Sequence, residues 1–153
     1  MPNSSEKVKR FLSEHSVPVE LVELNQSTRT SQMAADALKC DLAQIGKSIV
    51  FVNDKAVVAV ISGDKRVDDQ KLSKIVSHRV HIADADSVRR LTGYVIGGVP
   101  PFPHNKDVSV LLDSSLSRFE EIWTAAGTPN SVFKIKVDTL KSLLGTDFVD
   151  ISR

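Results

Sequence analysis

The 153-residue sequence has little cysteine, no long apolar run and almost no charge imbalance. Its single cysteine, Cys40, cannot form a disulfide within the chain, and such sparse use of cysteine is typical of a reducing compartment. No window approaches the roughly 18 consecutive apolar residues of a membrane-spanning helix. The N-terminal stretch MPNSSEKVKRFLSEH also lacks the apolar core of a secretory signal. We therefore expect a cytoplasmic protein with no membrane partner.

The formal net charge of +1 excludes a strong overall field that would draw the protein onto nucleic acid. A nucleic-acid partner would therefore need a local patch. Basic residues do gather in the middle third of the chain, and solvated helix faces explain them most simply. A modest patch that binds a few phosphates is the alternative. The cluster comprises Lys65, Arg66, Lys71, Lys74, Arg79, Arg89 and Arg90.

Motifs of the common enzyme classes are missing. There is no G-x-x-x-x-G-K-[ST] phosphate loop, no G-x-G-x-x-G after a strand and no G-x-S-x-G nucleophile elbow. Cys40 has no C-x-x-C partner and follows Ala37 and Leu38, which favours a buried, unreactive thiol over a nucleophile. The four histidines are scattered and no carboxylate pattern accompanies them, so we expect neither a metal site nor a cofactor.

What is present indicates an ordinary globular domain. Hydrophobic residues make up 41% of the chain and charged residues 25%, and 153 residues suffice for one substantial core. Helical and strand patterns interleave without a strict βαβ rhythm, and several strands form hairpin pairs. The sequence therefore predicts an α+β fold. We expect a single domain, residues 1–153, with a mixed, mostly antiparallel sheet surrounded by helices.

The individual elements follow from periodicity, caps and turn residues. Helices are expected at residues 4–15, 31–38, 68–76, 84–91 and 139–144, with caps at Ser31, Asp68 or Asp69, Asp84 and Asp138. Strands are expected at 17–24, 49–52, 56–61, 79–82, 108–112, 122–126, 132–137 and 148–149, with a polar loop at 25–29 and a short turn after Asp41. The nearly continuous apolar runs at 49–52 and 56–61 predict central strands buried on both faces. Lys134 and Lys136 alternate with apolar residues, so one face of their strand should meet water.

The stretch GYVIGGVPPFPH, residues 93–104, concentrates glycine and proline between apolar runs. Gly97 and Gly98 permit backbone angles closed to other residues and allow a ligand to approach the main chain. The three prolines fix their own φ angles, remove amide donors and favour extended conformations in the preceding residues. A stiff, non-helical loop is expected. From composition alone, both a tight connection between core elements and a ligand-binding loop remain open.

Lys47 stands at the start of an apolar strand, directly after Gly46. A lysine at the edge of a core is costly unless its amine reaches solvent or meets an anionic partner. The residue is therefore either a snorkelling lysine or a cation that faces a ligand. In the second case, its compact charge would hold a phosphate or polarise a carbonyl group.

Three motifs occur in an order that resembles a known family. They are GKSIVF at residues 46–51, the Gly97-x-x-x-Pro101 loop and the AGTPN turn at residues 126–130. Together they are similar to the YbaK/prolyl-tRNA synthetase editing-domain superfamily, the free-standing aminoacyl-tRNA deacylases. The likeness runs from Ser31 to Ile151. It implies a curved sheet wrapped by helices, and hydrolysis of the ester that joins a wrong amino acid to the terminal adenosine of tRNA. The resemblance also implies that a ribose hydroxyl, and no Ser or Cys nucleophile, assists attack by water.

The resemblance also assigns roles to residues. Lys47 is expected to face the terminal nucleotide, and the backbone of Gly97 and Gly98 to orient the ester carbonyl or the water. His104 is either a proton carrier or a packing residue of the loop. The residues expected to line the aminoacyl cleft are Val99, Pro101, Phe102, His104, Asp113, Gly127, Thr128 and Ser131.

Departures from the family pattern leave the edited amino acid open. Leu21, Val22 and Leu24 stand near a position where some relatives carry a tyrosine, and the turn at 127–130 lacks a cation. The expected partner is the acceptor end of an aminoacyl-tRNA, with an aminoacyl-tRNA synthetase as a further candidate. A non-catalytic tRNA- or synthetase-binding module and a hydrolase of small free esters are alternatives. Both a monomer and a homodimer remain open.

Overall fold

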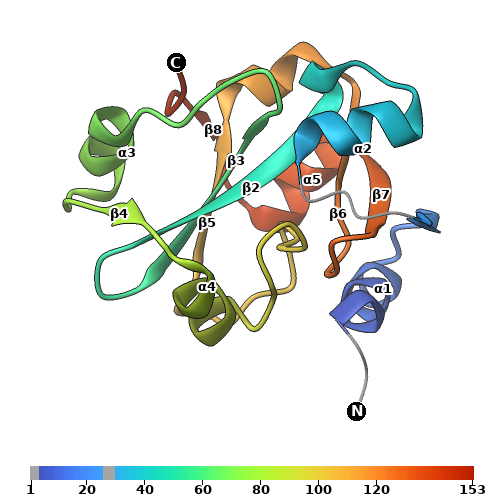
Figure 1. The fold of residues 1–153 in the computed structure, drawn as a ribbon, viewed down its shortest axis with the longest axis horizontal. Helices are drawn as coiled ribbons and strands as arrows, with labels where there is room; N and C mark the ends of the chain where they lie inside the picture. Colours follow the sequence, from blue (N-terminus) through green and yellow to red (C-terminus); the bar gives the residue numbers. More distant parts are fainter. Residues whose placement is uncertain (1–3, 26–29) are drawn as a thin grey trace.

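A mixed sheet of eight strands crosses the part of the chain that the structure, a computed structural model, describes, residues 4–25 and 30–153 (Figure 1). The strands lie in the order β1-β7-β6-β2-β3-β5-β8, and β4 pairs with β2. Four of the seven pairings are antiparallel, which confirms the mixed, mostly antiparallel sheet. The strands are β1 (Leu21–Glu23), β2 (Ile45–Val52), β3 (Ala56–Ser62), β4 (His81–Ile82), β5 (Ser109–Asp113), β6 (Glu121–Ala125), β7 (Ser131–Lys136) and β8 (Phe148–Val149).

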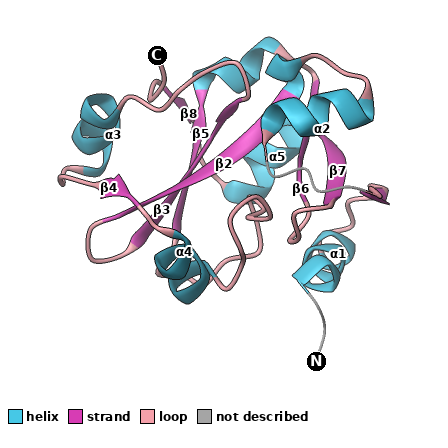
Figure 2. Cartoon of the chain, in the orientation of Figure 1, coloured by secondary structure: helices cyan, strands magenta, loops and turns pink. Residues whose placement is uncertain are grey.

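Helices cover both faces of the sheet, which makes this a single-domain α+β fold (Figure 2). They are α1 (Ser4–Glu14), α2 (Ser31–Leu38), α3 (Asp69–Val76), α4 (Ala85–Thr92) and α5 (Val137–Leu144), with short 3-10 turns η1 (Leu42–Gln44) and η2 (Ser114–Arg118). Residues of α1, α4 and α5 pack with Val50 and Val58 on one face. On the other face, α3 packs against Phe51 and α2 against Ile45. None of the helices in the described residues is long and apolar enough to cross a membrane.

The central hairpin and two helix caps agree with the sequence predictions. β2 and β3 are antiparallel neighbours, and all seven residues of β3 are buried. The side chain of Asp68 accepts hydrogen bonds from the first amides of α3, and Asp84 does the same for α4. In β7, Lys134 and Lys136 point to solvent, as their alternation predicts.

Other boundaries were wrong by a few residues. Thr30, not Ser31, caps α2 by accepting from the amide of Met33. α5 begins at Val137 directly after β7, so Asp138 lies inside the helix and does not cap it. This happens because Val137 is buried in the core and closes the strand-to-helix corner. The predicted strand at 17–24 is limited to the three residues that pair with β7. Four residues of the predicted polar loop at 25–29, residues 26–29, lie outside the described residues.

Candidate functional site

The candidate site lies where β2 and β6 separate. These parallel strands pair at only two positions, Ile45 with Trp123 and Gly46 with Thr124. β2 continues to Val52, and its end pairs with β4 instead. A cavity of about 430 Å³ lies beside this fork. Its walls are formed by β2, β6, the first turn of α2 and the loop that follows α4. The size falls in the usual range for small-molecule sites, about 300–1,000 Å³.

Lys47 lies in the wall of this cavity. It is half-buried, and its Nζ donates one long hydrogen bond of 3.4 Å to the carbonyl oxygen of Gly63. Burial lowers the pKa of the Lys47 amine, and the charge of Arg66 lowers it further, while Asp64 acts in the opposite direction. Among the described residues, no carboxylate forms an ion pair with Lys47. Within the described part of the chain, the amine is therefore a cation without an ion-pair partner.

The glycine-proline loop reaches the same cavity through Gly97 and Val99. Gly97 has a φ of +86°, a left-handed conformation that favours glycine. The amide of Gly98 donates to the carbonyl oxygen of Val95 at 2.9 Å, so it is engaged within the loop. In the part of the chain that the structure describes, the amides of Gly97 and Val99 make no hydrogen bond. The available donors in this loop are thus on Gly97 and Val99, and Gly98 has a packing role.

The turn at Gly127–Ser131 packs against this loop. A Cβ atom on Gly98 would lie 2.7 Å from the carbonyl carbon of Thr128, so only glycine allows the two segments to touch. Thr128 and Ser131 are joined through their hydroxyl groups at 2.6 Å, and Gly127 packs against the backbone of Ser4. None of the three predicted residues of this turn lines the cavity. Gly127, Thr128 and Ser131 therefore hold the loop in place.

The second half of the loop turns away into the core. Phe102 is buried and stacks on Phe11 with ring centroids 4.5 Å apart. The Nε2 of His104 donates to the carbonyl oxygen of Pro100 at 2.7 Å, and its ring meets the edge of Tyr94. Burial lowers the pKa of His104, although the hydrogen bond to Pro100 opposes this. These contacts support the packing interpretation of His104, and neither Pro101, Phe102 nor His104 reaches the cavity beside Lys47.

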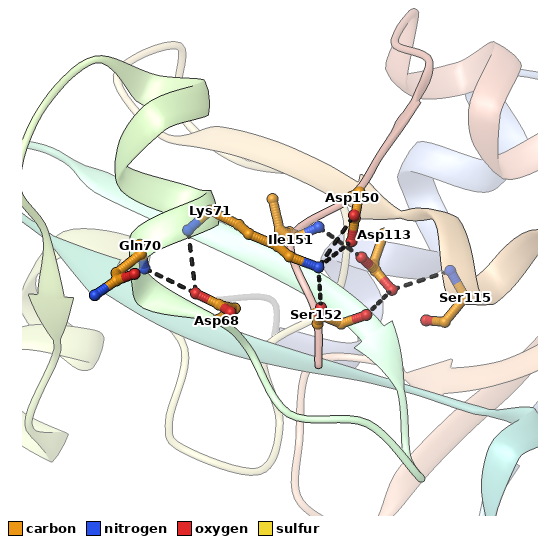
Figure 3. A network of polar contacts seen from close by, with 8 residues as sticks. All are labelled: Asp68, Gln70, Lys71, Asp113, Ser115, Asp150, Ile151 and Ser152. Atoms are coloured by element: carbon orange, nitrogen blue, oxygen red, sulfur yellow. Dashed lines mark hydrogen bonds and ion pairs between the residues drawn. The ribbon is translucent and has the colours of Figure 1, made fainter.

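Asp113 lies outside the cavity, contrary to the role that the resemblance assigns to it. Its carboxylate is fully buried and accepts hydrogen bonds from the amide of Ile151 at 2.9 Å, the amide of Ser115 at 3.0 Å and the hydroxyl of Ser152 at 2.8 Å (Figure 3). Burial raises its pKa, but these donors more than offset burial and keep the pKa below its usual value. Asp113 therefore binds the C-terminal segment to the end of β5.

Comparison with known proteins shows the family of this chain. The model of the aminoacyl-tRNA editing domain family matches residues 25–143, most of the chain. The chain belongs to this family. The uncharacterised protein YwhH of Bacillus subtilis is 31% identical over 118 residues, which cover 76% of this chain and 75% of YwhH. The protein EbsC of Enterococcus faecalis, provisionally named a Cys-tRNA(Pro)/Cys-tRNA(Cys) deacylase, is 26% identical over 151 residues, 94% of this chain and 90% of EbsC.

A solved structure shares the whole fold of this editing domain. It is provisionally described as a trans-editing enzyme for prolyl tRNA synthetase. The two chains are 35% identical, with a TM-score of 0.90 over 100% of this chain and 99% of the other. The resemblance of the sequence to the editing-domain superfamily is therefore confirmed, together with the fold that it implies.

The editing-domain cavity also contains residues that the sequence prediction missed. Ser48 and Thr124 belong to its wall, and both hydroxyl oxygens are buried without a partner among the described residues. A signal was available, because each is a small polar residue within an apolar strand. Ile96 is half-exposed at the same cavity and was missed as well.

The other candidate groups of this editing domain stay apart from the cavity. Cys40 packs beside α2, and burial and the charge of Asp41 raise the pKa of its thiol, which disfavours the reactive thiolate. Within the described residues, no three His, Cys, Asp or Glu side chains gather closely enough to hold a metal ion.

Proposed function

We propose that this protein is a trans-editing aminoacyl-tRNA deacylase, which hydrolyses the ester bond of mischarged tRNA. Membership of the aminoacyl-tRNA editing domain family supports a hydrolase that acts on aminoacyl-tRNA. The names given to EbsC and to the structural relative point to the same class of reaction. The most direct structural support is that Lys47, Gly97 and Val99 line one cavity, and that the amides of Gly97 and Val99 make no hydrogen bond among the described residues. The expected partner is the acceptor end of the tRNA.

The chemistry needs no nucleophilic side chain. A water molecule adds to the carbonyl carbon of the aminoacyl ester, and the negative charge that develops on the carbonyl oxygen meets amide donors of the loop. The bond from this carbon to the ribose oxygen then breaks, and the ribose oxygen takes up a proton. The neighbouring ribose hydroxyl orients the water and relays its proton. The hydroxyl-bearing residues of the cavity lining, Thr30, Ser31, Ser48 and Thr124, are compatible with this water-based chemistry.

Lys47 would bind the terminal nucleotide as a point charge. Its amine lies between the carbonyl oxygen of Gly63 and the cavity, and it has no competing carboxylate partner among the described residues. Burial of the amine disfavours its charged form, and an anionic phosphate beside it would favour the charged form again. Lys47 is therefore the side chain on which the proposal depends most.

The test is a deacylation screen with purified protein and a panel of correctly and incorrectly charged tRNAs. We expect at least one mischarged tRNA to be hydrolysed well above the spontaneous rate. Lys47→Met should reduce this rate about 100-fold or more while the protein stays folded, because the change removes a half-buried charge without an ion pair. Lys55→Ala, at an exposed ion pair with Asp107, is the matched control and should keep the full rate.

Two results would contradict the proposal. Binding of charged tRNA without any hydrolysis would favour a non-catalytic binding module. Hydrolysis of free aminoacyl esters at rates that do not depend on the tRNA or on salt would favour a small-molecule hydrolase. Full activity in Lys47→Met would refute the assignment of the site.

A further inference from the structure

A second cavity of about 470 Å³ adjoins the first along β2. The two cavities share Lys47 and Ile49, which lie on the same face of the strand because their positions differ by two. Figure 1 shows β2 passing between α2 at one end and α3 with β4 at the other. The first cavity lies at the α2 end, and the second lies between β2, β4 and the start of α3. The residues of the second cavity therefore lie next to those of the first along β2.

The second cavity combines an apolar floor with a basic rim. Ile49, Phe51 and Ile61 form the floor. Ile82 stands at the edge with 66% of its surface exposed, an unusual position for a large aliphatic side chain. The basic groups of the lining are Lys47, Arg66 and His81, and the carboxylate of the lining is Asp69. An apolar floor beside cations suits a nucleotide, which presents a flat base and an anionic phosphate.

The side chain of Arg66 is available to bind an anion. Two hydrogen bonds to Arg153 fix its backbone. The amide of Arg66 donates to the carbonyl oxygen of Arg153 at 3.1 Å, and the amide of Arg153 donates to the carbonyl oxygen of Arg66 at 2.8 Å. Its guanidinium is exposed and forms no ion pair with another described residue. The nearby carboxylate of Asp64 is already neutralised by Arg118, at 2.7 and 3.2 Å. Among the described residues, neither Arg66 nor Lys47 forms an ion pair, and Asp69 is the carboxylate that lines the same cavity.

The charge of the surrounding segment supports the same partner. Residues 65–90 contain seven Lys and Arg residues and four Asp residues, so the segment carries a net +3, while the rest of the chain carries −2. Of the basic cluster noted in the sequence, Arg66 lines the second cavity, and Lys71 and Lys74 lie on α3, which borders it. A net positive charge on this segment favours the approach of phosphates.

We propose that the second cavity is the subsite for the nucleotide that precedes the aminoacylated adenosine. Its base would lie on Ile49, Phe51 and Ile82, and the phosphate that joins the two nucleotides would lie between Lys47 and Arg66. The inference rests on the proposed function, and it adds a direction: the single-stranded RNA end runs from β4 past Lys47 into the fork between β2 and β6. Consecutive nucleotides of one strand need contiguous sites, and the shared residue Lys47 makes these two cavities contiguous.

The test compares two substrates that carry the same amino acid, an aminoacyl-tRNA and an aminoacyl ester of adenosine alone. Arg66→Ala should raise KM for the aminoacyl-tRNA about tenfold, since a charge-assisted contact to phosphate is lost. It should leave hydrolysis of the aminoacyl-adenosine unchanged. The negative slope of log affinity against log salt concentration should become shallower by about 1. Arg66→Lys should restore part of the affinity, and Asp69→Asn should lower KM by removing a negative charge from the rim.

A control is Lys55→Ala, which changes a lysine at an exposed ion pair with Asp107 and should leave both KM values unchanged. If Arg66→Ala raised KM equally for both substrates, Arg66 would belong to the first cavity and the inference would be wrong. The inference would also be wrong if Arg66→Ala changed KM for neither substrate. Failure of the wild-type protein to hydrolyse either ester would contradict the proposed function instead. Titration of the trinucleotide CCA without an attached amino acid, followed by NMR, tests the subsite independently of hydrolysis. Shifts at Ile82 and Ile49 that disappear in Arg66→Ala support the subsite, and absence of shifts at Ile82 refutes it.

Discussion

Gly98 packs directly on the backbone of Thr128. A Cβ atom at residue 98 would lie 2.7 Å from the carbonyl carbon of Thr128 and 2.8 Å from its Cα. Contacts this short force a displacement, and backbone atoms on both sides cannot move as a flexible side chain can. The contact therefore sets the position of the neighbouring Gly97 and Val99 amides at the cavity.

We predict that Gly98→Ala reduces deacylation about 100-fold, because a displacement of about 1 Å at a positioning element can cost that much. Circular dichroism and thermal unfolding should show a folded protein. Gly145→Ala is the comparison: its φ is +62° and no atom lies within 4 Å of the added Cβ. It should cost about 1 kcal/mol of stability and keep the full rate. An active Gly98→Ala protein would show that the contact does not set the loop.

Lys47 should give the reaction an alkaline limit. Burial, and then the charge of Arg66, lower the pKa of its amine from 10.5. The cation is therefore lost at a lower pH than for an ordinary lysine. After subtraction of spontaneous hydrolysis, the rate with aminoacyl-tRNA should fall on the alkaline side at a pH below 10.5.

Two variants test the origin of this limit. Arg66→Ala should move it to higher pH, because a neighbouring positive charge is removed. Lys47→Arg should abolish it, because a guanidinium stays protonated. An alkaline limit that persists unchanged in Lys47→Arg would mean that another group titrates.

His104 should make the fold sensitive to mild acid. Burial lowers its pKa below 6.5 in the folded protein, so the unfolded chain takes up a proton first as the pH falls. The free energy of unfolding should therefore decrease between about pH 7 and the lowered pKa, and stay level below it. In His104→Gln, urea unfolding at several pH values should show a flatter profile over this range. Deacylation at neutral pH should change little, because His104 does not line the cavity.

Asp113 should contribute stability that acid removes. Its pKa is lowered because donors from Ser115, Ile151 and Ser152 outweigh burial. The contribution is present above the usual pKa of 3.8 and is lost as the pH falls through the lower folded value. Asp113→Asn should reduce the free energy of unfolding by about 3 kcal/mol at neutral pH, measured by urea denaturation. Asp150→Ala, at the exposed ion pair with Lys71, should cost less than about 1 kcal/mol. A large loss of activity per folded molecule in Asp113→Asn would argue for a role in the cleft.

Local signals in the sequence were sufficient for much of the fold. Asp68 and Asp84 cap their helices because an aspartate side chain satisfies free amides within the next three residues, an interaction that short-range sequence already contains. The hairpin of β2 and β3 needs only a short turn, residues 53–55, between two apolar runs. Lys47 was recognisable too, because a cation is conspicuous at the start of an apolar strand.

The tertiary structure decided which candidate residues meet. Gly98 and Thr128 touch across 30 positions of sequence, and Asp113 binds the amide of Ile151 across 38. Neither distance follows from composition or periodicity, because both depend on how the strands are ordered in the sheet. Within one loop, Gly97 and Val99 face the cavity, while Phe102 and His104 turn into the core, where Phe11 and Tyr94 provide ring contacts.

The sequence by itself thus determined most of the elements and the family, and it marked Lys47 as a candidate, since these depend on residue type and local spacing. Only the tertiary structure separated the residues that line the cavity from those that support it. It also revealed the adjoining cavity at Arg66, because strand order and the packing of α3 bring distant residues to one face of β2.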